Sequence, residues 1–321
     1  MRHVDAEQGA WFAETFDLLV AGVGQVVLGK ERTVRTALMA MVAEGHLLLE
    51  DAPGTGKTSL AKALAACVQG THSRIQFTPD LLPSDVTGVS VWDQGRGRFE
   101  FHRGPVFASV VLADEINRAS PKTQSALLEV MEEGNVTVDG VSHPVGTPFM
   151  VIATQNPVEQ AGTYRLPEAQ LDRFLVRTSL GYPDRAATLE ILAGARDRTG
   201  DLEPLVTTAA LGEMSAIAGR VHVDTAVLDY VARLVEATRE DPRTVLGVSV
   251  RGALALVRCA RVWAASAGRG HVLPADVKDL VGPVLAHRLL LTPDAELDGV
   301  GAHDVVADVL ERTPAPTVRL V

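Results

Sequence analysis

Short apolar runs separated by helical patterns fill the first half of the chain. The runs cover 46–50, 74–77, 106–113 and 149–153, and each is followed by polar or glycine residues. After the first run, Leu60, Leu64 and Val68 recur at the spacing of one helical face. Runs of this length predict buried strands, and their alternation with helices predicts an α/β fold with a parallel sheet flanked by helices.

Two stretches alternate in polarity and predict β-hairpins inserted in this α/β region. The first runs from 89 to 101 around Gly95-Arg96-Gly97, and the second runs from 136 to 141 around Asp139-Gly140. The first also carries Trp92, which we expect to be exposed, and arginines near its tip. It is either a decorated hairpin or a loop presented to a partner, and the sequence favours neither.

The pattern changes after Gly181-Tyr182-Pro183, because strand-length runs disappear and helical spacing continues to the C-terminus. We expect helices at 186–195, 208–218, 225–238, 250–265 and 274–289. The chain therefore divides into a predicted α/β domain over 1–181, which includes an N-terminal helix over 1–23, and a predicted small all-helical domain over 182–321.

Composition narrows the class of protein. The 321 residues suffice for two domains, and 46% are hydrophobic, enough for a substantial core. The net charge of −10 argues against general affinity for nucleic acid or for an anionic membrane. No apolar run approaches the ~20 residues that span a bilayer, and the acidic stretch over 1–17 is unlike a signal peptide. Cys67 and Cys259 suggest no disulfide framework, so we expect a cytoplasmic protein without membrane insertion.

The turn between the first strand and the following helix has the residues of a phosphate-binding loop. A strand, a glycine turn and a helix that opens on Gly-Lys-Thr place backbone N–H groups and the helix dipole toward an anion. Lys57 supplies a charge for the β- and γ-phosphates, and the Thr58 hydroxyl supplies a ligand for Mg²⁺. The predicted nucleotide-binding residues are Pro53, Gly54, Thr55, Gly56, Lys57, Thr58 and Ser59.

Asp51 departs from the phosphate-loop pattern, which has glycine at this position. A carboxylate directed at a triphosphate would repel it. We therefore expect Asp51 to face away from the phosphates or to pair with a cation.

Polar residues after two later strands predict the rest of the site. Asp114 is expected to hold Mg²⁺ through water, and Glu115 to polarise the attacking water. A strand that merely ends in solvated acids is the simpler alternative. Asn156 follows the run at 149–153, and ligands of open α/β sheets bind at the carboxyl ends of strands. It is a candidate for holding the water or the γ-phosphate, or else part of an ordinary Asn-Pro turn.

Taken together, the motifs resemble the MoxR group of AAA+ ATPases from about residue 24 to residue 291. The resemblance rests on Gly54-Thr55-Gly56-Lys57-Thr58, Asp114-Glu115-Ile116-Asn117-Arg118-Ala119, Ala153-Thr154-Gln155-Asn156-Pro157 and Leu166-Pro167-Glu168-Ala169-Gln170-Leu171-Asp172-Arg173-Phe174. It implies an AAA+ core with two hairpin insertions and a helical lid. It also implies a homo-oligomeric ring, expected to be a hexamer, that binds ATP and Mg²⁺ between subunits.

The resemblance also implies roles for three residues. Asn156 becomes the sensor that orients the attacking water, and Arg173 the arginine finger that reaches the ATP of a neighbouring subunit. Arg251 falls at the second sensor of the lid, although the usual Ser-Pro-Arg reads Ser249-Val250-Arg251 here. Members of this group remodel or mature client proteins as chaperones, often with a partner that carries a von Willebrand A domain.

Three other functions are compatible with parts of the pattern. A monomeric P-loop kinase for a small metabolite would use the phosphate loop without Arg173 of a neighbour. A motor on DNA would need a basic stripe, which the net charge does not encourage. A motor subunit of a metal-chelatase complex belongs to the same wider group and would be found with a large partner.

Overall fold

A computed structural model of the protein describes residues 4–52, 54–156, 163–193 and 202–317. The chain packs as two compact units. The sheet unit comprises the described parts of Leu19–Leu166 and Thr178–Gly212. The helical unit comprises the described parts of Met1–Leu18, Pro167–Arg177 and Glu213–Val321.

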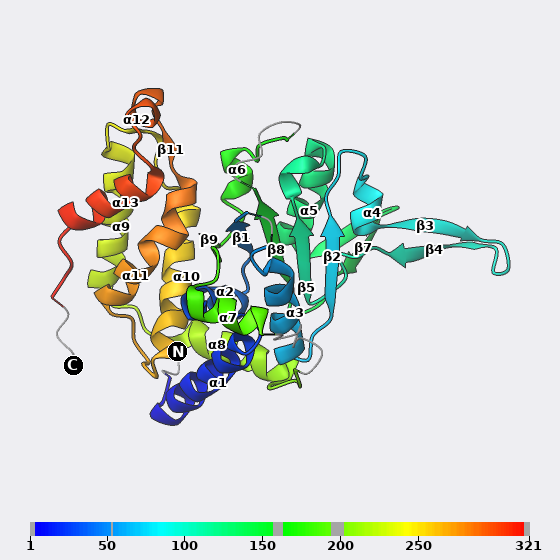
Figure 1. Ribbon diagram of the computed structural model, residues 1–321, viewed down its shortest axis with the longest axis horizontal. Coiled ribbons are helices and arrows are strands. Elements are labelled where there is room, and N and C mark those ends of the chain that lie inside the picture. The colour runs from blue at the N-terminus through cyan, green and yellow to red at the C-terminus, as the bar shows by residue number, and fades with distance from the viewer. Residues whose placement is uncertain (1–3, 53, 157–162, 194–201, 318–321) are drawn as a thin grey trace. The chain divides into compact units, whose positions relative to one another are not determined.

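A five-stranded sheet with the order β2-β5-β8-β1-β9 forms the centre of the fold (Figure 1). Its strands are β1 Leu47–Glu50, β2 His72–Gln76, β5 Val110–Asp114, β8 Met150–Gln155 and β9 Val176–Thr178. The pairs β2–β5, β5–β8 and β1–β8 are parallel. Every residue of β5 is buried, as expected of a strand covered on both faces, which explains why the four residues before Asp114 are all apolar. The prediction of a parallel sheet is confirmed.

The ends of the helices follow local sequence signals. Helix α5 shows the signals best, because the Ser120 hydroxyl accepts a hydrogen bond from the Thr123 amide, Pro121 is its first residue, and Gly134 ends it with a φ of 65°. The helices up to α8 are α1 Ala6–Gly24, α2 Glu31–Val42, α3 Lys57–Cys67, α4 Pro83–Thr87, η1 Ile116–Arg118, α5 Pro121–Glu133, α6 Glu168–Leu171, α7 Arg185–Leu192 and α8 Thr208–Arg220.

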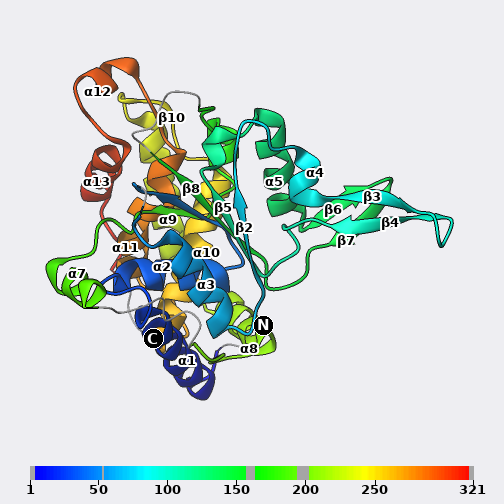
Figure 2. The ribbon, with the colours of Figure 1, turned by 45° about the vertical axis from the view of Figure 1, so that its right-hand side comes forward.

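Both predicted hairpins are present and lie side by side (Figures 1 and 2). They are formed by β3 Gly88–Asp93 with β4 Arg98–Arg103, and by β6 Asn135–Val138 with β7 Val141–Pro144. The Phe101 ring of one stacks on the His143 ring of the other at 4.2 Å between centroids. Trp92 is half exposed and contacts Phe99 edge-on at 5.1 Å.

The helical unit contains most of the helices predicted for the C-terminal part. The predicted helices in this unit are α9 Thr225–Glu240, α10 Val250–Ser266 and α11 Pro274–Leu285, the last followed by η3 Ala286–Arg288. Two further helices, α12 Pro293–Leu297 and α13 Ala302–Arg312, were not predicted. The predicted all-helical composition needs one correction, because β10 Thr244–Leu246 pairs antiparallel with β11 Leu290–Leu291. Strands of two and three residues are too short to produce a recognisable alternation.

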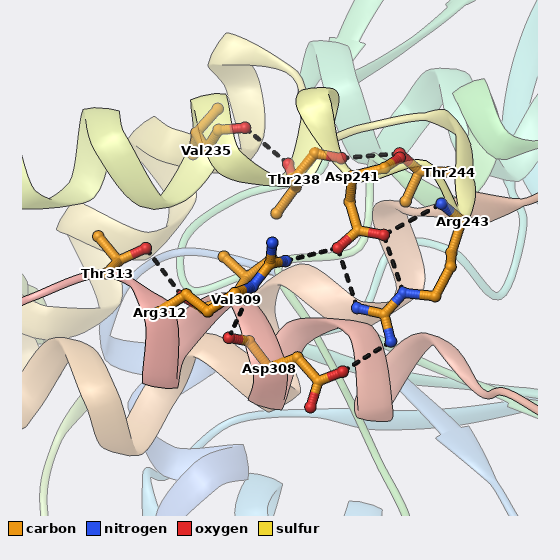
Figure 3. A network of polar contacts seen from close by, with 9 residues as sticks. All are labelled: Val235, Thr238, Asp241, Arg243, Thr244, Asp308, Val309, Arg312 and Thr313. Atoms are coloured by element: carbon orange, nitrogen blue, oxygen red, sulfur yellow. Dashed lines mark hydrogen bonds and ion pairs between the residues drawn. The ribbon is translucent and has the colours of Figure 1, made fainter.

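A buried carboxylate joins the end of α9 to α13 (Figure 3). Asp241 is 3% exposed and accepts hydrogen bonds from Arg243 Nε at 2.9 Å and from Arg312 Nη2 at 2.6 Å. Arg243 also pairs with Asp308 at 2.6 Å. The hydrogen bonds from Arg243 hold the pKa of the Asp241 carboxyl well below its ordinary value.

Cys67 and Cys259 are free, buried thiols. Burial raises the pKa of Cys67 to about 11 and that of Cys259 to about 12. Neither thiol therefore forms a reactive thiolate at neutral pH.

The division into compact units differs from the domain boundary predicted between residues 181 and 182. After β9, the segment Thr178–Gly212 belongs to the sheet unit, whereas Pro167–Arg177 belongs to the helical unit. The chain thus changes units more than once, and a single composition change along the sequence could not indicate this. The assignment of 1–181 and 182–321 as domains stays a prediction.

Candidate functional site

The phosphate loop connects β1 to α3 with the predicted geometry. Gly54 and Gly56 have φ angles of 82° and 94°, which side-chain-bearing residues rarely adopt, and Gly56 is the N-cap of α3. The Leu60 amide donates the first helical hydrogen bond to Gly56, at 3.0 Å. The amides of Lys57, Thr58 and Ser59 precede that bond and are thus available to an anion. Thr55 lies between the two glycines and donates its hydroxyl to the Ala52 carbonyl at 3.3 Å. Pro53 lies outside the described residues.

The Lys57 side chain lies along this loop. Its ammonium group donates hydrogen bonds to the carbonyl oxygens of Ala52 at 3.0 Å and Asp51 at 3.3 Å. The positive charge is thus held at the loop that precedes the helix, where phosphates bind in P-loop proteins.

Asp51 is bound by backbone amides of a distant segment. Its two carboxylate oxygens accept hydrogen bonds from the amides of Leu180 at 2.6 Å and Gly181 at 2.8 Å, and the residue is 5% exposed. We expected Asp51 either to face away from the phosphates or to pair with a cation. Backbone amides bind its carboxylate in place of a cation. Charge-assisted bonds of this kind stabilise a buried carboxylate. At the position where the phosphate-loop pattern has glycine, Asp51 therefore binds the loop to the connection that follows β9.

Asp114 and Glu115 stand at the end of β5, beside β8. Asp114 Oδ1 accepts the Thr154 hydroxyl at 2.6 Å, and the same hydroxyl oxygen accepts the Glu115 amide at 2.8 Å. Glu115 has a φ of 57°, an uncommon conformation for a residue with a side chain. Such a conformation persists only where the surroundings impose it, and it is concentrated at functional sites.

The edge strand β2 contributes two side chains that the sequence analysis missed. Arg74 Nη2 pairs with Asp114 Oδ2 at 2.6 Å, and Gln76 Nε2 donates to Glu115 Oε2 at 2.8 Å. The parallel register places Gln76 opposite Asp114. Arg118 also donates to Glu115 Oε2, at 3.0 Å. Side chains two residues apart on a strand point to the same face. This spacing could have indicated that Arg74 and Gln76 lie on one face of β2.

Asn156 lies at the carboxyl ends of the strands, on the same side of the sheet as the phosphate loop and the acidic pair. It directly follows β8, which lies between β5 and β1, and Gln155 is in register with Glu50. The ends of three adjacent strands thus bring together the phosphate loop, the acidic pair and Asn156.

Arg173 and Arg251 belong to the helical unit. Arg173 follows α6 and is half-buried, and Arg251 is an exposed residue in the first turn of α10. Their predicted approach to a nucleotide stays a prediction.

The residues of the sheet unit suit ATP and Mg²⁺. The loop amides and Lys57 offer donors and positive charge to phosphates. The Thr58 hydroxyl and the Asp114 carboxylate are hard oxygen ligands, which Mg²⁺ prefers in combination with phosphate oxygens. When bound, Mg²⁺ neutralises charge on the phosphates.

The parallel sheet, the phosphate loop and the acidic pair on the neighbouring strand define an AAA+ ATPase. Residues 46–176 match the family described as ATPase family associated with various cellular activities (AAA), and residues 236–309 match the AAA lid domain. A crystal structure from Cytophaga hutchinsonii, of a protein provisionally named as an ATPase, has a TM-score of 0.90 at 36% identity. The similarity covers 97% of this chain and 98% of the chain in that crystal structure.

Relatives across nearly the whole chain specify the family. The chain is 40% identical to Chaperone MoxR1 of Mycobacterium tuberculosis over 98% of this chain and 86% of that protein. It is 32% identical to Protein MoxR of Paracoccus denitrificans over 91% of this chain and 93% of that protein. An uncharacterised Bacillus subtilis protein, YeaC, is 44% identical over 94% of both chains. This chain belongs to the MoxR family of AAA+ ATPases.

Within the part of the chain that the structure describes, no helix has both the length and the apolar character required to cross a bilayer.

Proposed function

We propose that this protein hydrolyses ATP to ADP and phosphate, with Mg²⁺, and uses the reaction to remodel or mature client proteins. The observation that carries the proposal is that the carboxyl ends of β1, β5 and β8 are adjacent. The loop after β1 leads to Lys57 and Thr58 at the start of α3, Asp114 and Glu115 lie at the end of β5, and Asn156 follows β8. Phosphoryl transfer depends mainly on positioning and electrostatic stabilisation, which such a cluster supplies.

Each residue has a distinct task in this proposal. Lys57 and the loop amides bind the phosphates, while Thr58 and Asp114 hold the metal ion. Glu115 accepts a proton from the attacking water, a contribution of roughly 10²–10⁴-fold to the rate. Asn156 orients that water.

The second part of the proposal is a homo-oligomeric ring, a hexamer, in which Arg173 acts on the ATP of a neighbouring subunit and Arg251 is the second sensor of the lid. Support comes from the motif that contains Arg173 and from membership of the MoxR family. The Mycobacterium tuberculosis relative is named a chaperone, which supports action on protein clients. We propose that this action takes place in the cytoplasm. A partner with a von Willebrand A domain is proposed from the resemblance alone.

Mixed oligomers test the ring directly. Arg173→Ala and Lys57→Ala should each abolish hydrolysis, and mixing them should restore part of it, because each variant completes the site that the other lacks. Activity of the unmodified protein should also fall on dilution. Full activity in a proven monomer would contradict the ring and favour a monomeric kinase or ATPase.

The client is tested separately. Glu115→Gln should retain ATP without cleaving it, and affinity capture with this variant should retain the client protein or a partner complex. Capture of a large chelatase-type partner would instead support a motor subunit.

A further inference from the structure

The residue immediately before Arg173 is held by two different elements of the helical unit. Asp172 Oδ1 accepts a hydrogen bond from Arg288 Nε at 2.7 Å, and Asp172 Oδ2 accepts one from the Ser249 hydroxyl at 3.2 Å. Arg288 belongs to η3, and Ser249 precedes α10. Both carboxylate oxygens are therefore engaged, one by each element.

Arg288 also holds the backbone on both sides of Arg173. Its Nη2 donates to the carbonyls of Asp172 at 3.3 Å and Phe174 at 2.7 Å, and its Nη1 donates to the carbonyl of Leu175 at 3.3 Å. Arg288 is only 5% exposed. A buried guanidinium has a fixed, planar set of donors, so it constrains the turn more tightly than a single hydrogen bond would.

Ser249 links the same carboxylate to the helix that carries Arg251. The Ser249 hydroxyl oxygen caps α10 by accepting the Gly252 amide at 3.2 Å, and Arg251 lies in the first turn of that helix. A cation in the first turn is disfavoured by the helix dipole. The position of Arg251 is therefore not explained by helix stability. The Asp172 carboxylate, bound to Ser249 at the cap, places a negative charge at the N-terminus of α10.

We propose that Asp172 is a positioning residue that fixes Arg173 relative to Arg251, through Arg288 and Ser249. The inference rests on the proposed ring, in which Arg173 serves a neighbouring subunit. Because its anchors are η3 and the start of α10, Arg173 moves with the helical unit. A movement of that unit in one subunit would then displace the arginine that serves the next subunit's ATP.

Asp172→Asn tests this role, because it keeps the side-chain size but removes the charge that holds Arg288. We expect kcat to fall about 10–100-fold, the scale of a misplaced catalytic group. The KM for ATP should change less than about threefold, since the phosphate loop is intact. Mixing with Lys57→Ala should restore part of the activity, because that variant supplies a correctly held Arg173. Mixing with Arg173→Ala should restore none.

Asp276→Asn is the matched control. Asp276 is 3% exposed and pairs with Arg269 through bonds of 2.6 and 2.8 Å in the same unit, so its loss disturbs a comparable buried ion pair. We expect it to lower the thermal midpoint but to keep kcat. An equal loss of kcat in Asp276→Asn would assign the Asp172 effect to general destabilisation and overturn the proposal.

A second variant keeps the test decisive if Asp172→Asn does not fold. Ser249→Gly removes the hydroxyl that binds Asp172, and glycine is a tolerated N-cap. It should lower kcat in the same direction, with the same rescue by Lys57→Ala. Unchanged kcat in the folded variants, or no rescue, overturns the positioning role while Arg173→Ala still behaves as expected. Full activity of Arg173→Ala would instead overturn the proposed ring function, and this inference with it.

Discussion

The backbone amide of Gly181 donates a hydrogen bond of 2.8 Å to Oδ1 of Asp51, a residue 130 positions earlier in the chain. The same connection is held twice from the start of α2. Lys30 donates to the Tyr182 carbonyl at 2.6 Å, and Thr33 donates to the Ser179 carbonyl at 3.0 Å. The phosphate loop and the segment after β9 are therefore fastened together, and Asp51 performs a structural task at a position where the phosphate-loop pattern has glycine.

Asp51→Asn should lower the stability of the protein by about 1–3 kcal/mol, the cost of leaving a buried polar group unsatisfied. The amide side chain keeps one acceptor oxygen, but its NH₂ group faces one of the two backbone donors. Asp51→Gly should destabilise at least as much, although it restores the glycine of the pattern. The midpoint of urea unfolding measures both effects.

Asp139→Asn is a suitable control for that experiment. Asp139 is an exposed turn residue with a φ of 51°, a conformation that asparagine also adopts readily. Its unfolding midpoint should match that of the unmodified protein. A midpoint for Asp51→Asn equal to that of this control would show that the two amide bonds contribute no net stability.

Thr154 should affect catalysis through its hydroxyl alone. This hydroxyl is 2.6 Å from Asp114 Oδ1 and accepts the Glu115 amide at 2.8 Å, so it holds both acids of the site. Thr154→Val keeps the shape but removes both bonds, and we expect kcat to fall about tenfold or more, because the acids lose their orientation. Thr154→Ser should retain most of the activity. Equal steady-state rates for the valine and serine variants would contradict this role.

Local patterns were enough to predict four of the five strands of the sheet, both hairpins, and the strand, turn and helix of the phosphate loop. They did not predict β9, which has only three residues. The Asp139-Gly140 turn and the helix that begins at Lys57 each depend on neighbours within a few residues. The positions of Asp114, Glu115 and Asn156 could be predicted as well, because Asp114 is the last residue of β5, and Glu115 and Asn156 directly follow β5 and β8.

Contacts between distant segments could not be predicted in this way. Thr154 meets Asp114 only because β8 lies beside β5, and Gln76 meets Glu115 only because β2 lies on the other side. The partners of Asp51 depend on where the chain runs after β9. The order of the strands and the path of the chain after β9 are properties of the folded sheet. Local patterns in a single sequence do not show them.

If Asp114 holds Mg²⁺ as proposed, Arg74 would compete with the metal ion for this carboxylate. Its guanidinium lies 2.6 Å from Asp114 Oδ2 and its side chain is about half exposed. Removing this charge should strengthen Mg²⁺ binding. We expect Arg74→Ala to lower the Mg²⁺ concentration for half-maximal ATPase activity about two- to fivefold, since exposed ion pairs contribute about 0.2–1 kcal/mol.

Arg98→Ala controls for the loss of one positive charge from the same unit. Arg98 pairs with Glu100 at 3.0 Å on the β4 strand, so its loss does not change the partners of Asp114. The Mg²⁺ requirement of this variant should equal that of the unmodified protein. An unchanged or higher Mg²⁺ requirement in Arg74→Ala would show that Arg74 does not compete for the metal ligand.

The Asp241 cluster should make the stability of the helical unit depend on pH. Because Arg243 and Arg312 bind the ionised carboxylate, the pKa of Asp241 is depressed in the folded state. A depressed carboxyl pKa stabilises the fold above the unfolded-state pKa of about 3.9 and loses that contribution as pH falls toward the folded value. Asp241→Asn should therefore be less stable than the unmodified protein at pH 7, by about 1.5–3 kcal/mol.

The difference between the two proteins is the quantity to measure. Urea unfolding of both, followed from pH 8 to pH 3, should give a constant difference above about pH 5 and a narrowing one below about pH 4. Asp308→Asn should show a smaller difference at pH 7, because the Asp308 side chain is half exposed and its carboxylate pairs with Arg243, whereas Arg312 binds the Asp308 backbone carbonyl, which the substitution keeps. A difference that stays constant down to pH 3 would mean that Asp241 stabilises the unit by packing, without a contribution from its charge.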